Sequence, residues 1–354
     1  MRPASDLVRR RLRRWYGRHR RDLPWRRTRD PYKIWISEVL LQQTQVATAL
    51  PYYQRFLRRF PTVGVLAASP LEAVLQAWSG LGYYRRARYL HAAAARIVEQ
   101  HRGEFPRSWE QARALPGVGE YTAAAVLSIA YGAALALVDG NVQRVLARLC
   151  AVRQVLGARK RRALRSLAQE LLDPRDPGGW NQALMELGAL VCLPASPRCD
   201  VCPLRALCGA RAAGNPERYP RLPPRRGSEK VRVGVALVER GAALLWHRRS
   251  DQAELLAGMW ELPHARLAWR ADDGHEDIRG ALALALRQRY RLRLDLGNPV
   301  ATARHAITFR RLSLIGYRAH LQPGCRPRGP QWRWRSPAQA RRLAHSSVWA
   351  KLLG

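Results

Sequence analysis

The first 212 residues repeat apolar positions at the spacing of amphipathic helices and show no strand-like alternation. In DPYKIWISEVLLQQTQVATAL, Asp30 suits a helix N-cap and Pro31 suits the first helical position. In SWEQARAL, Ser108 and Gln111 have the spacing of a capping box. LPGVG interrupts the helical pattern, and EYTAAAVLSIAYG resumes it. The pattern therefore predicts a module that is mainly α-helical.

From about Ala213 the pattern changes. GNPERYPRLPPRRGSEK is rich in proline, glycine and charge, which is typical of a linker. Beyond it, VRVGVALVER, GAALLWHRR and RRLSLIGYRAHL are typical of strands, and EDIRGALALALRQRY is typical of one helix. We therefore expect a helical domain at 1–212, a linker at 213–229 and an α+β domain at 230–354.

The charge of the chain indicates a polyanionic partner. Its 354 residues carry a formal net charge of +36, and nucleic acid is the default partner of so basic a protein. Only four of the 62 basic residues are lysine, so the arginine excess could equally reflect genome composition. The arginine-rich N-terminus lacks the apolar segment of a signal peptide, and no apolar run is long enough to span a membrane. We expect a cytoplasmic protein with no membrane partner.

Four of the six cysteines follow the pattern C-x6-C-x2-C-x5-C. They are Cys192, Cys199, Cys202 and Cys208. Four thiolates in so short a span can hold one tetrahedral metal ion or one [4Fe–4S] cluster. Zinc sites usually bring two CxxC pairs from separate elements, whereas this run is compact and asymmetric. The spacing favours the cluster, with zinc and unrelated buried cysteines as the alternatives.

Two further segments indicate contact with a negatively or positively charged group. In LPGVGEYTAAAV, Gly117 and Gly119 would form a hairpin that turns backbone N–H groups toward a phosphate, or only a tight helix–helix turn. In VDGNVQRVLARL, Asp139 and Asn141 precede a helix. Either residue could be its N-cap, or Asp139 could be a functional carboxylate that the helix dipole keeps ionised.

The stretch SEVLLQQTQ places one carboxylate among neutral amides. Glu38, Gln42 and Gln45 stand at i, i+4 and i+7, which is one face of a continuous helix. A solvated face would normally carry charges. We interpret the neutral amides as groups that contact nucleic-acid bases rather than phosphates.

These segments together resemble the helix–hairpin–helix DNA glycosylase superfamily with its iron–sulfur loop, here 192–208. Between residues 20 and 210, five segments are similar, in this order, to the MutY family of adenine DNA glycosylases: SEVLLQQTQVATALPYY, GLGYYRRARYLH, LPGVGEYTAAAV, VDGNVQRVLARL and NQALMELGALVC. The resemblance implies a [4Fe–4S] cluster and excision of adenine mispaired with 8-oxoguanine or guanine during base excision repair. It implies double-stranded DNA as partner, a flipped target base, a monomer, and action at the bacterial nucleoid.

The resemblance also assigns roles. Cleavage of an N-glycosidic bond needs a proton donor and a group that stabilises an oxocarbenium-like sugar. Glu38, in an apolar helix, should have a raised pKa and protonate adenine N7. Asp139 should stay ionised and face the sugar, with a transient covalent bond left open, and Asn141 should orient this network.

Tyr121 stands where endonuclease III has the lysine that forms a Schiff base. We therefore expect a monofunctional glycosylase. A bifunctional endonuclease III-like enzyme and a non-catalytic DNA-binding relative are the alternatives. Gln42 should reach into the duplex beside the vacated space, and Gly117 and Gly119 should contact phosphates. Tyr83 resembles the aromatic wedge near the mispair, or is a core tyrosine.

The C-terminal domain resembles a Nudix fold through GVALVERGAALLWHRRSDQAELLAGMWELP. Its helix GALALALRQRY has no acid to hold Mg²⁺, which argues against a pyrophosphatase. The resemblance implies instead a domain that recognises 8-oxoguanine. The family's Phe-Ser-His loop aligns with Ile307-Thr308-Phe309, so Thr308 keeps a hydroxyl for the oxidised base. The histidine is absent and His305 lies upstream, so the preference for 8-oxoguanine over guanine is less determined than the glycosylase assignment.

Overall fold

The computed structural model describes residues 5–221, 227–268 and 274–353. Residues 222–226 of the expected linker lie outside the described residues. By their contacts the described residues form two units. The first unit comprises those within 1–68 and 89–224, and the second comprises 69–88 with those within 225–354. The segment 69–88 therefore groups with the C-terminal unit, although it lies within the helical domain expected at 1–212.

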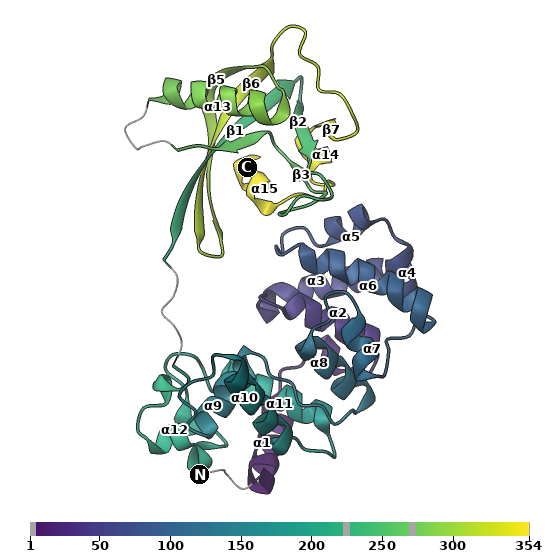
Figure 1. Cartoon of the computed structure of the whole chain (residues 1–354), viewed down its shortest axis with the longest axis vertical. Helices are drawn as coiled ribbons and strands as arrows, with labels where there is room; N and C mark the ends of the chain where they lie inside the picture. The colour runs from purple at the N-terminus through teal and green to yellow at the C-terminus, as the bar shows by residue number, and fades with distance from the viewer. Residues whose placement is uncertain (1–4, 222–226, 269–273, 354) are drawn as a thin grey trace. The chain divides into compact units, whose positions relative to one another are not determined.

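The first unit is helical, as its sequence pattern predicts. Its helices are α1 (Ser5–His19), η1 (Pro24–Arg26), α2 (Pro31–Leu41), α3 (Val46–Arg59), α4 (Val63–Ala68), α6 (Arg85–His101, which begins in the second unit), α7 (Trp109–Ala114), α8 (Glu120–Tyr131), α9 (Gly140–Leu149), α10 (Ala158–Leu171), α11 (Pro177–Leu190), η2 (Cys199–Val201), η3 (Arg205–Leu207), α12 (Gly209–Ala212) and η4 (Pro216–Arg218) (Figure 1).

The helix starts follow the sequence signals. Asp30 caps α2 by accepting the N–H groups of Tyr32 and Lys33, and Pro31 takes the first helical position. Ser108 caps α7 by accepting the N–H of Gln111. Asp30 and Ser108 are thus confirmed as N-caps, and of the expected capping box the bond from the Gln111 N–H to Ser108 is present.

Helices α2 and α8 pack against each other, and α8 and α9 both pack against α11. Most residues of α2 and α8 are buried, because both helices are apolar on nearly all sides. The small side chains Ala123, Ala124 and Ala125 let α8 approach its neighbours closely. These three contacts bring residues near 38, 121, 139 and 186 into one region.

The second unit holds a seven-stranded sheet. Its elements are α5 (Leu71–Ala77), β1 (Glu229–Arg240), β2 (Ala243–Arg248), β3 (Trp260–Glu261), β4 (His264–Arg266), α13 (His275–Tyr290), β5 (Leu294–Ile307), β6 (Arg310–Leu321), β7 (Trp332–Arg335), α14 (Pro337–Ala340) and α15 (Ser347–Leu353). The strand order is β3-β2-β1-β6-β5, with β4 paired to β1 and β7 paired to β2.

Strands β1 and β6 are parallel and the other pairs are antiparallel. Alternate side chains of β1 enter two cores. Val235 and Leu237 pack in the core that contains Trp349 and Leu352 of α15, whereas Ala236 packs in the core that contains α13. Helices therefore cover both faces of the sheet, and Figure 1 shows α13 lying across one of them. The α+β class agrees with expectation.

Candidate active site

Glu38 of α2 is 4% exposed, within an otherwise apolar helix. Burial raises the pKa of Glu38 to about 7, the nearby charge of Asp139 adds to the rise, and the Tyr121 hydrogen bond and the Arg26 charge oppose it. At neutral pH this carboxyl is therefore present in both its protonated and ionised forms. Such a group can both give and take a proton.

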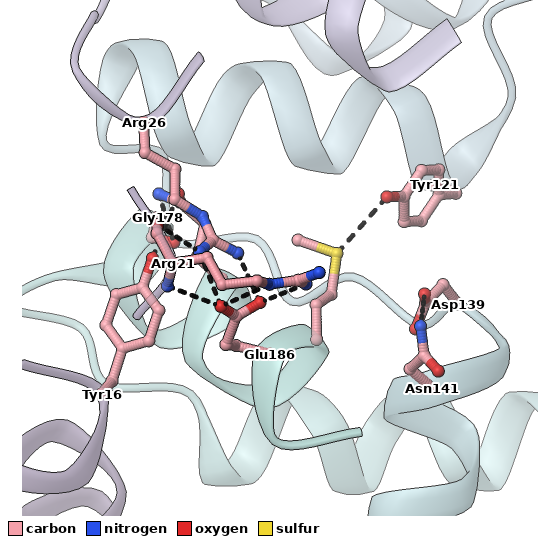
Figure 2. Close-up of polar contacts among 10 residues, drawn as sticks. Tyr16, Arg21, Arg26, Tyr121, Asp139, Asn141, Gly178 and Glu186 are labelled. Atoms are coloured by element: carbon pink, nitrogen blue, oxygen red, sulfur yellow. Dashed lines mark hydrogen bonds and ion pairs between the residues drawn. The ribbon is translucent and has the colours of Figure 1, made fainter. Parts of the chain in front are cut away.

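Tyr121, at the start of α8, donates its hydroxyl proton to Glu38 Oε2 over 2.6 Å. The Tyr121 hydroxyl oxygen also lies 3.4 Å from the sulfur of Met185 on α11. Figure 2 shows Asp139 and Asn141 below Tyr121. Burial and the charge of Glu38 raise the pKa of the Tyr121 hydroxyl well above its ordinary value, so this group stays a proton donor.

Asp139 is the N-cap of α9 and accepts the N–H of Val142 over 2.7 Å. Its second carboxylate oxygen accepts from Asn141 Nδ2 over 3.1 Å. Burial raises the pKa of Asp139, although these hydrogen bonds and the charge of Arg144 lower it. The helix start was expected to keep Asp139 ionised, and the capping hydrogen bonds that favour this are present. Burial has the larger effect, however, so the pKa of Asp139 lies above its ordinary value. Capping and a position beside Glu38 are thus compatible roles.

A hydrogen-bond chain leads from Asp139 toward the cysteine segment. Asn141 Oδ1 accepts from Arg144 Nη2 over 2.9 Å, and Arg144 also donates to the carbonyls of Gly188 and Cys192, each over 2.7 Å. A Cβ on Gly188 would lie 2.6 Å from Asn141 Cβ, so only glycine permits this approach of α9 to α11. Arg144 could not be recognised from the sequence, because it stands in a regular helical position of VQRVLARL.

Glu186 of α11 was also missed. It is 1% exposed and receives hydrogen bonds from two guanidinium groups, those of Arg21 and Arg26. Burial alone would raise the pKa of Glu186, but these bonds lower it to about 2. Figure 2 shows both arginines converging on this carboxylate. The available signal was that Glu186 is the sole acid in NQALMELGALVC, a segment otherwise suited to burial.

Gln42 and Gln45 do not extend the helix of Glu38. Helix α2 ends at Leu41, Gln42 is its C-cap, Gln43 has φ of +57°, and Gln45 is the N-cap of α3. The prediction that Gln45 shares one helical face with Glu38 is therefore wrong. Gln42 Nε2 instead donates to Thr122 Oγ1 over 3.2 Å, next to Tyr121 in sequence.

The glycines of the hairpin differ. Gly117 has φ of +72°, and a Cβ there would lie 2.6 Å from Tyr89 Cβ, so this position requires glycine. Gly119 is the N-cap of α8 with φ of −84° and has open space around it, so neither sterics nor backbone requires glycine there. The turn between α7 and α8 is the expected helix–hairpin–helix.

Two other expected DNA contacts lie in the second unit. Tyr83 has φ of +48° and is 47% exposed, which is contrary to the core alternative. Thr308 has φ of +54° and lies exposed in the turn between β5 and β6, where its hydroxyl donates to the carbonyl of Ile307. The aromatic side chain of Tyr83 and the hydroxyl side chain of Thr308 are thus both exposed at tight turns.

The four cysteines line one hollow, together with several arginines including Arg148. Burial raises the pKa of the Cys202 thiol to about 12, and it raises those of Cys199 and Cys208. Arg148 Nη1 lies 3.4 Å from Cys192 Sγ. Among the described residues, no three or more cysteines, histidines or acids are grouped as a site for one metal ion.

Known proteins are similar to the chain over much of its length. The HhH-GPD superfamily of base excision DNA repair proteins matches residues 36–174. The adenine DNA glycosylase of Homo sapiens is 40% identical over 308 residues, which cover 70% of this chain and 56% of that protein. The adenine DNA glycosylase of Rattus norvegicus is 39% identical over 322 residues, covering 76% of this chain and 62% of that protein. The chain thus spans less than two thirds of these relatives.

Solved structures are similar to more than half of the chain. A thermostable thymine-DNA glycosylase superposes with a TM-score of 0.54 at 30% identity, covering 59% of this chain and 97% of that one. Endonuclease III in a trapped covalent DNA intermediate superposes with a TM-score of 0.52 at 26% identity, covering 60% and 98%. Within the described residues, no helix has the length and apolar character needed to cross a membrane.

Proposed function

The chain belongs to the HhH-GPD superfamily of base excision DNA repair proteins and resembles its adenine DNA glycosylases, and we propose that it removes adenine from DNA as a monofunctional N-glycosylase. We propose A:8-oxoguanine and A:guanine mispairs in double-stranded DNA as the substrates of a monomeric enzyme. The observation that carries the proposal is the buried Glu38 carboxyl, with a pKa of about 7, hydrogen-bonded to Tyr121 beside Asp139.

In the proposed reaction, protonated Glu38 gives its proton to N7 of the flipped adenine. The C1′–N9 bond then breaks with its electron pair going to the base, which leaves neutral. The positive charge on the sugar is stabilised by the Asp139 carboxylate. Water adds to C1′ and loses a proton to the ionised Glu38, which leaves an abasic site and restores the enzyme.

Other groups of the site hold this arrangement. Arg26, fixed by Glu186, places a positive charge near Glu38, which keeps the pKa of Glu38 from rising further. Asn141 and Arg144 hold the Asp139 carboxylate through their chain of hydrogen bonds. We propose these four as supports for the proton donor and the sugar-facing carboxylate.

The absence of strand cleavage is also part of the proposal. A Schiff base needs an amine, and at Tyr121 the side chain next to Glu38 is a phenol that stays protonated. A bifunctional enzyme of the endonuclease III type remains the alternative. Trapping of a protein–DNA adduct by borohydride would favour that alternative.

We propose that a [4Fe–4S] cluster binds to Cys192, Cys199, Cys202 and Cys208. The four thiols line one hollow, and the Arg148 guanidinium lies close enough to Cys192 Sγ to offset thiolate charge. The compact and asymmetric spacing of the four cysteines favours a cluster over zinc. When bound, the cluster supplies iron–thiolate bonds that would order the basic segment 192–208.

For the second unit we propose recognition of the base opposite adenine, without hydrolysis, on a Nudix-like scaffold. Thr308 presents its hydroxyl at the exposed β5–β6 turn. Helix α13 carries Glu276 and Asp277 only in its first turn, and Arg287 and Arg289 in its last. Such a helix offers no row of carboxylates to bind Mg²⁺.

A strand-labelled duplex tests the proposal. A:8-oxoguanine and A:guanine duplexes are incubated with the protein or with Glu38→Gln, and are then analysed with and without alkali. We expect cleavage at adenine only after alkali, only with the unchanged protein, and faster opposite 8-oxoguanine. Intact DNA after alkali would refute the glycosylase assignment, and equal rates on both duplexes would refute the role of the second unit.

A further inference from the structure

The segment that carries Tyr83 is a tight turn between α5 and α6. Gly80, Gly82 and Tyr83 all have positive φ, of +97°, +70° and +48°. Such a backbone is strained for a tyrosine and persists only where its surroundings fix it. Trp78 is one such restraint, because it is fully buried and its indole N–H donates to the carbonyl of Gly82 over 3.2 Å.

The turn is attached to the C-terminal part of the second unit through one carbonyl oxygen. Tyr84 donates its hydroxyl proton to the carbonyl of His345 over 3.0 Å and accepts the N–H of Gly80 over 3.2 Å. Ser79 donates its hydroxyl to the same His345 carbonyl over 3.0 Å. A carbonyl oxygen has two lone pairs, so both donors can be accommodated.

The His345 carbonyl is itself fixed by the sheet. His345 is 8% exposed, bridges Trp260 of β3, and has its ring 5.6 Å from the ring of Trp246 on β2. Both tryptophans belong to the core that includes α15. The position of this carbonyl is therefore set by the packed interior of the sheet.

Contacts on either side restrain the segment further. Trp260 Nε1 donates to Glu72 over 3.2 Å, and Arg88 donates to the carbonyl of Ala257 over 3.0 Å. These contacts stand before and after the turn in sequence. The turn thus has little freedom to shift relative to the sheet while its two central hydrogen bonds are intact.

The turn presents an aromatic ring and a cation. The Arg86 guanidinium lies 5.2 Å from the Trp78 ring centroid and 5.6 Å from that of Tyr83, while Tyr83 stays 47% exposed. An exposed aromatic ring backed by a guanidinium is suited to stack on a nucleic-acid base.

We infer that Ser79 and Tyr84 are positioning residues, through which the C-terminal sheet sets the placement of Tyr83 against DNA. The contact between Tyr83 and DNA rests on the proposed function. The hydrogen bonds of Ser79 and Tyr84 to the His345 carbonyl, in contrast, are present in the protein without DNA. The second unit would then both position the Tyr83 ring and supply the base contact at Thr308.

The first experiment measures hydrogen exchange of the amides at 80–83 in the full-length protein without DNA. We expect at least threefold faster exchange in Ser79→Ala and in Tyr84→Phe. The matched control is Tyr131→Phe, which removes another tyrosine hydroxyl bonded to a carbonyl, that of Phe105. Unchanged exchange in Ser79→Ala, which leaves the acceptor of the Gly80 amide intact, would overturn the inference.

The second experiment is a double-mutant cycle on the dissociation constant for an A:8-oxoguanine duplex. We expect Tyr84→Phe to weaken binding about fivefold, Tyr83→Ala about tenfold, and the double variant no more than Tyr83→Ala alone. Effects that multiply would show that Tyr84 does not act through Tyr83. Binding is read independently of adenine release, so loss of excision in the unchanged protein would refute the proposed function and leave the cycle interpretable.

Discussion

At the scale of single residues, Glu38 combines a chemical use with a cost to stability. The folded protein keeps its proton up to a pKa of about 7, whereas the ordinary value is 4.5. Between these values the unfolded chain has lost a proton that the folded chain retains. The free energy of unfolding therefore falls as pH rises through this window, and it is unaffected by Glu38 below it.

The replacement Glu38→Gln removes this titration. We expect the variant to gain stability relative to the unchanged protein as pH rises from about 4.5 to 7, by a total on the order of 3 kcal/mol. Denaturant unfolding of both proteins at several pH values measures this difference. A difference that does not change with pH would show that Glu38 has an ordinary pKa.

Asp139 has two roles that one pair of substitutions separates. Asparagine caps a helix as well as aspartate does. The free energy of unfolding of Asp139→Asn should therefore lie within about 0.5 kcal/mol of that of the unchanged protein. The loss of its negative charge should slow single-turnover adenine release roughly 10²–10³-fold. Asp139→Ala serves as control and should lose about 1 kcal/mol of stability in addition. A nearly normal rate for Asp139→Asn would reduce Asp139 to a cap.

At the scale of elements, the cysteine segment 192–208 has only the short 3-10 turns η2 and η3 as regular secondary structure, and Arg144 and Arg148 donate to carbonyls at its start. Such a segment depends on ligand bonds more than on its backbone. We expect Cys202→Ser to lose bound iron and sulfide and to lower the unfolding temperature, whereas Cys325→Ser in the second unit should change neither. Iron and sulfide content with thermal unfolding provides the measurement, and zinc in place of iron would exclude the cluster.

Local signals predicted the starts of elements better than their ends. Asp30 and Ser108 cap their helices because a side-chain oxygen next to a helix start needs no distant partner. The end of α2 at Leu41 escaped prediction, because SEVLLQQTQ has no glycine or proline and the break lies in the left-handed backbone of Gln43. Strands β3 and β4 are two and three residues long, too short for an alternating pattern.

The candidate site divided in the same way. Three site residues could be predicted, because their segments are similar in sequence to a known family: Glu38, Tyr121 and Asp139. The partners of Glu186 are Arg21 and Arg26, about 160 residues away, and no local pattern links them. The contacts that join 69–88 to the C-terminal sheet include hydrogen bonds to the backbone carbonyls of His345 and Ala257, and a backbone carbonyl carries no sequence signature.

At the scale of the whole molecule, the net charge of +36 has two readings that salt can distinguish. If the arginines contact DNA phosphates, the logarithm of the binding constant should fall with the logarithm of salt concentration with a slope of about −4 or steeper. Fluorescence anisotropy from roughly 50 to 200 mM salt measures it. Matched duplexes with and without 8-oxoguanine should share the slope. A slope near zero would attribute the charge to genome composition.

The pair of Arg21 and Arg26 with Glu186 has a consequence for synthesis of the protein. The Glu186 carboxylate is buried, so it needs its two arginine partners, which lie far earlier in the sequence. During translation, Arg21 and Arg26 leave the ribosome long before Glu186, and they cannot form this pair until α11 follows. Closure of so long a loop is a late and slow folding event. In a nascent chain that ends before residue 186, Arg21 and Arg26 should thus still lack the partner that fixes Arg26 near Glu38.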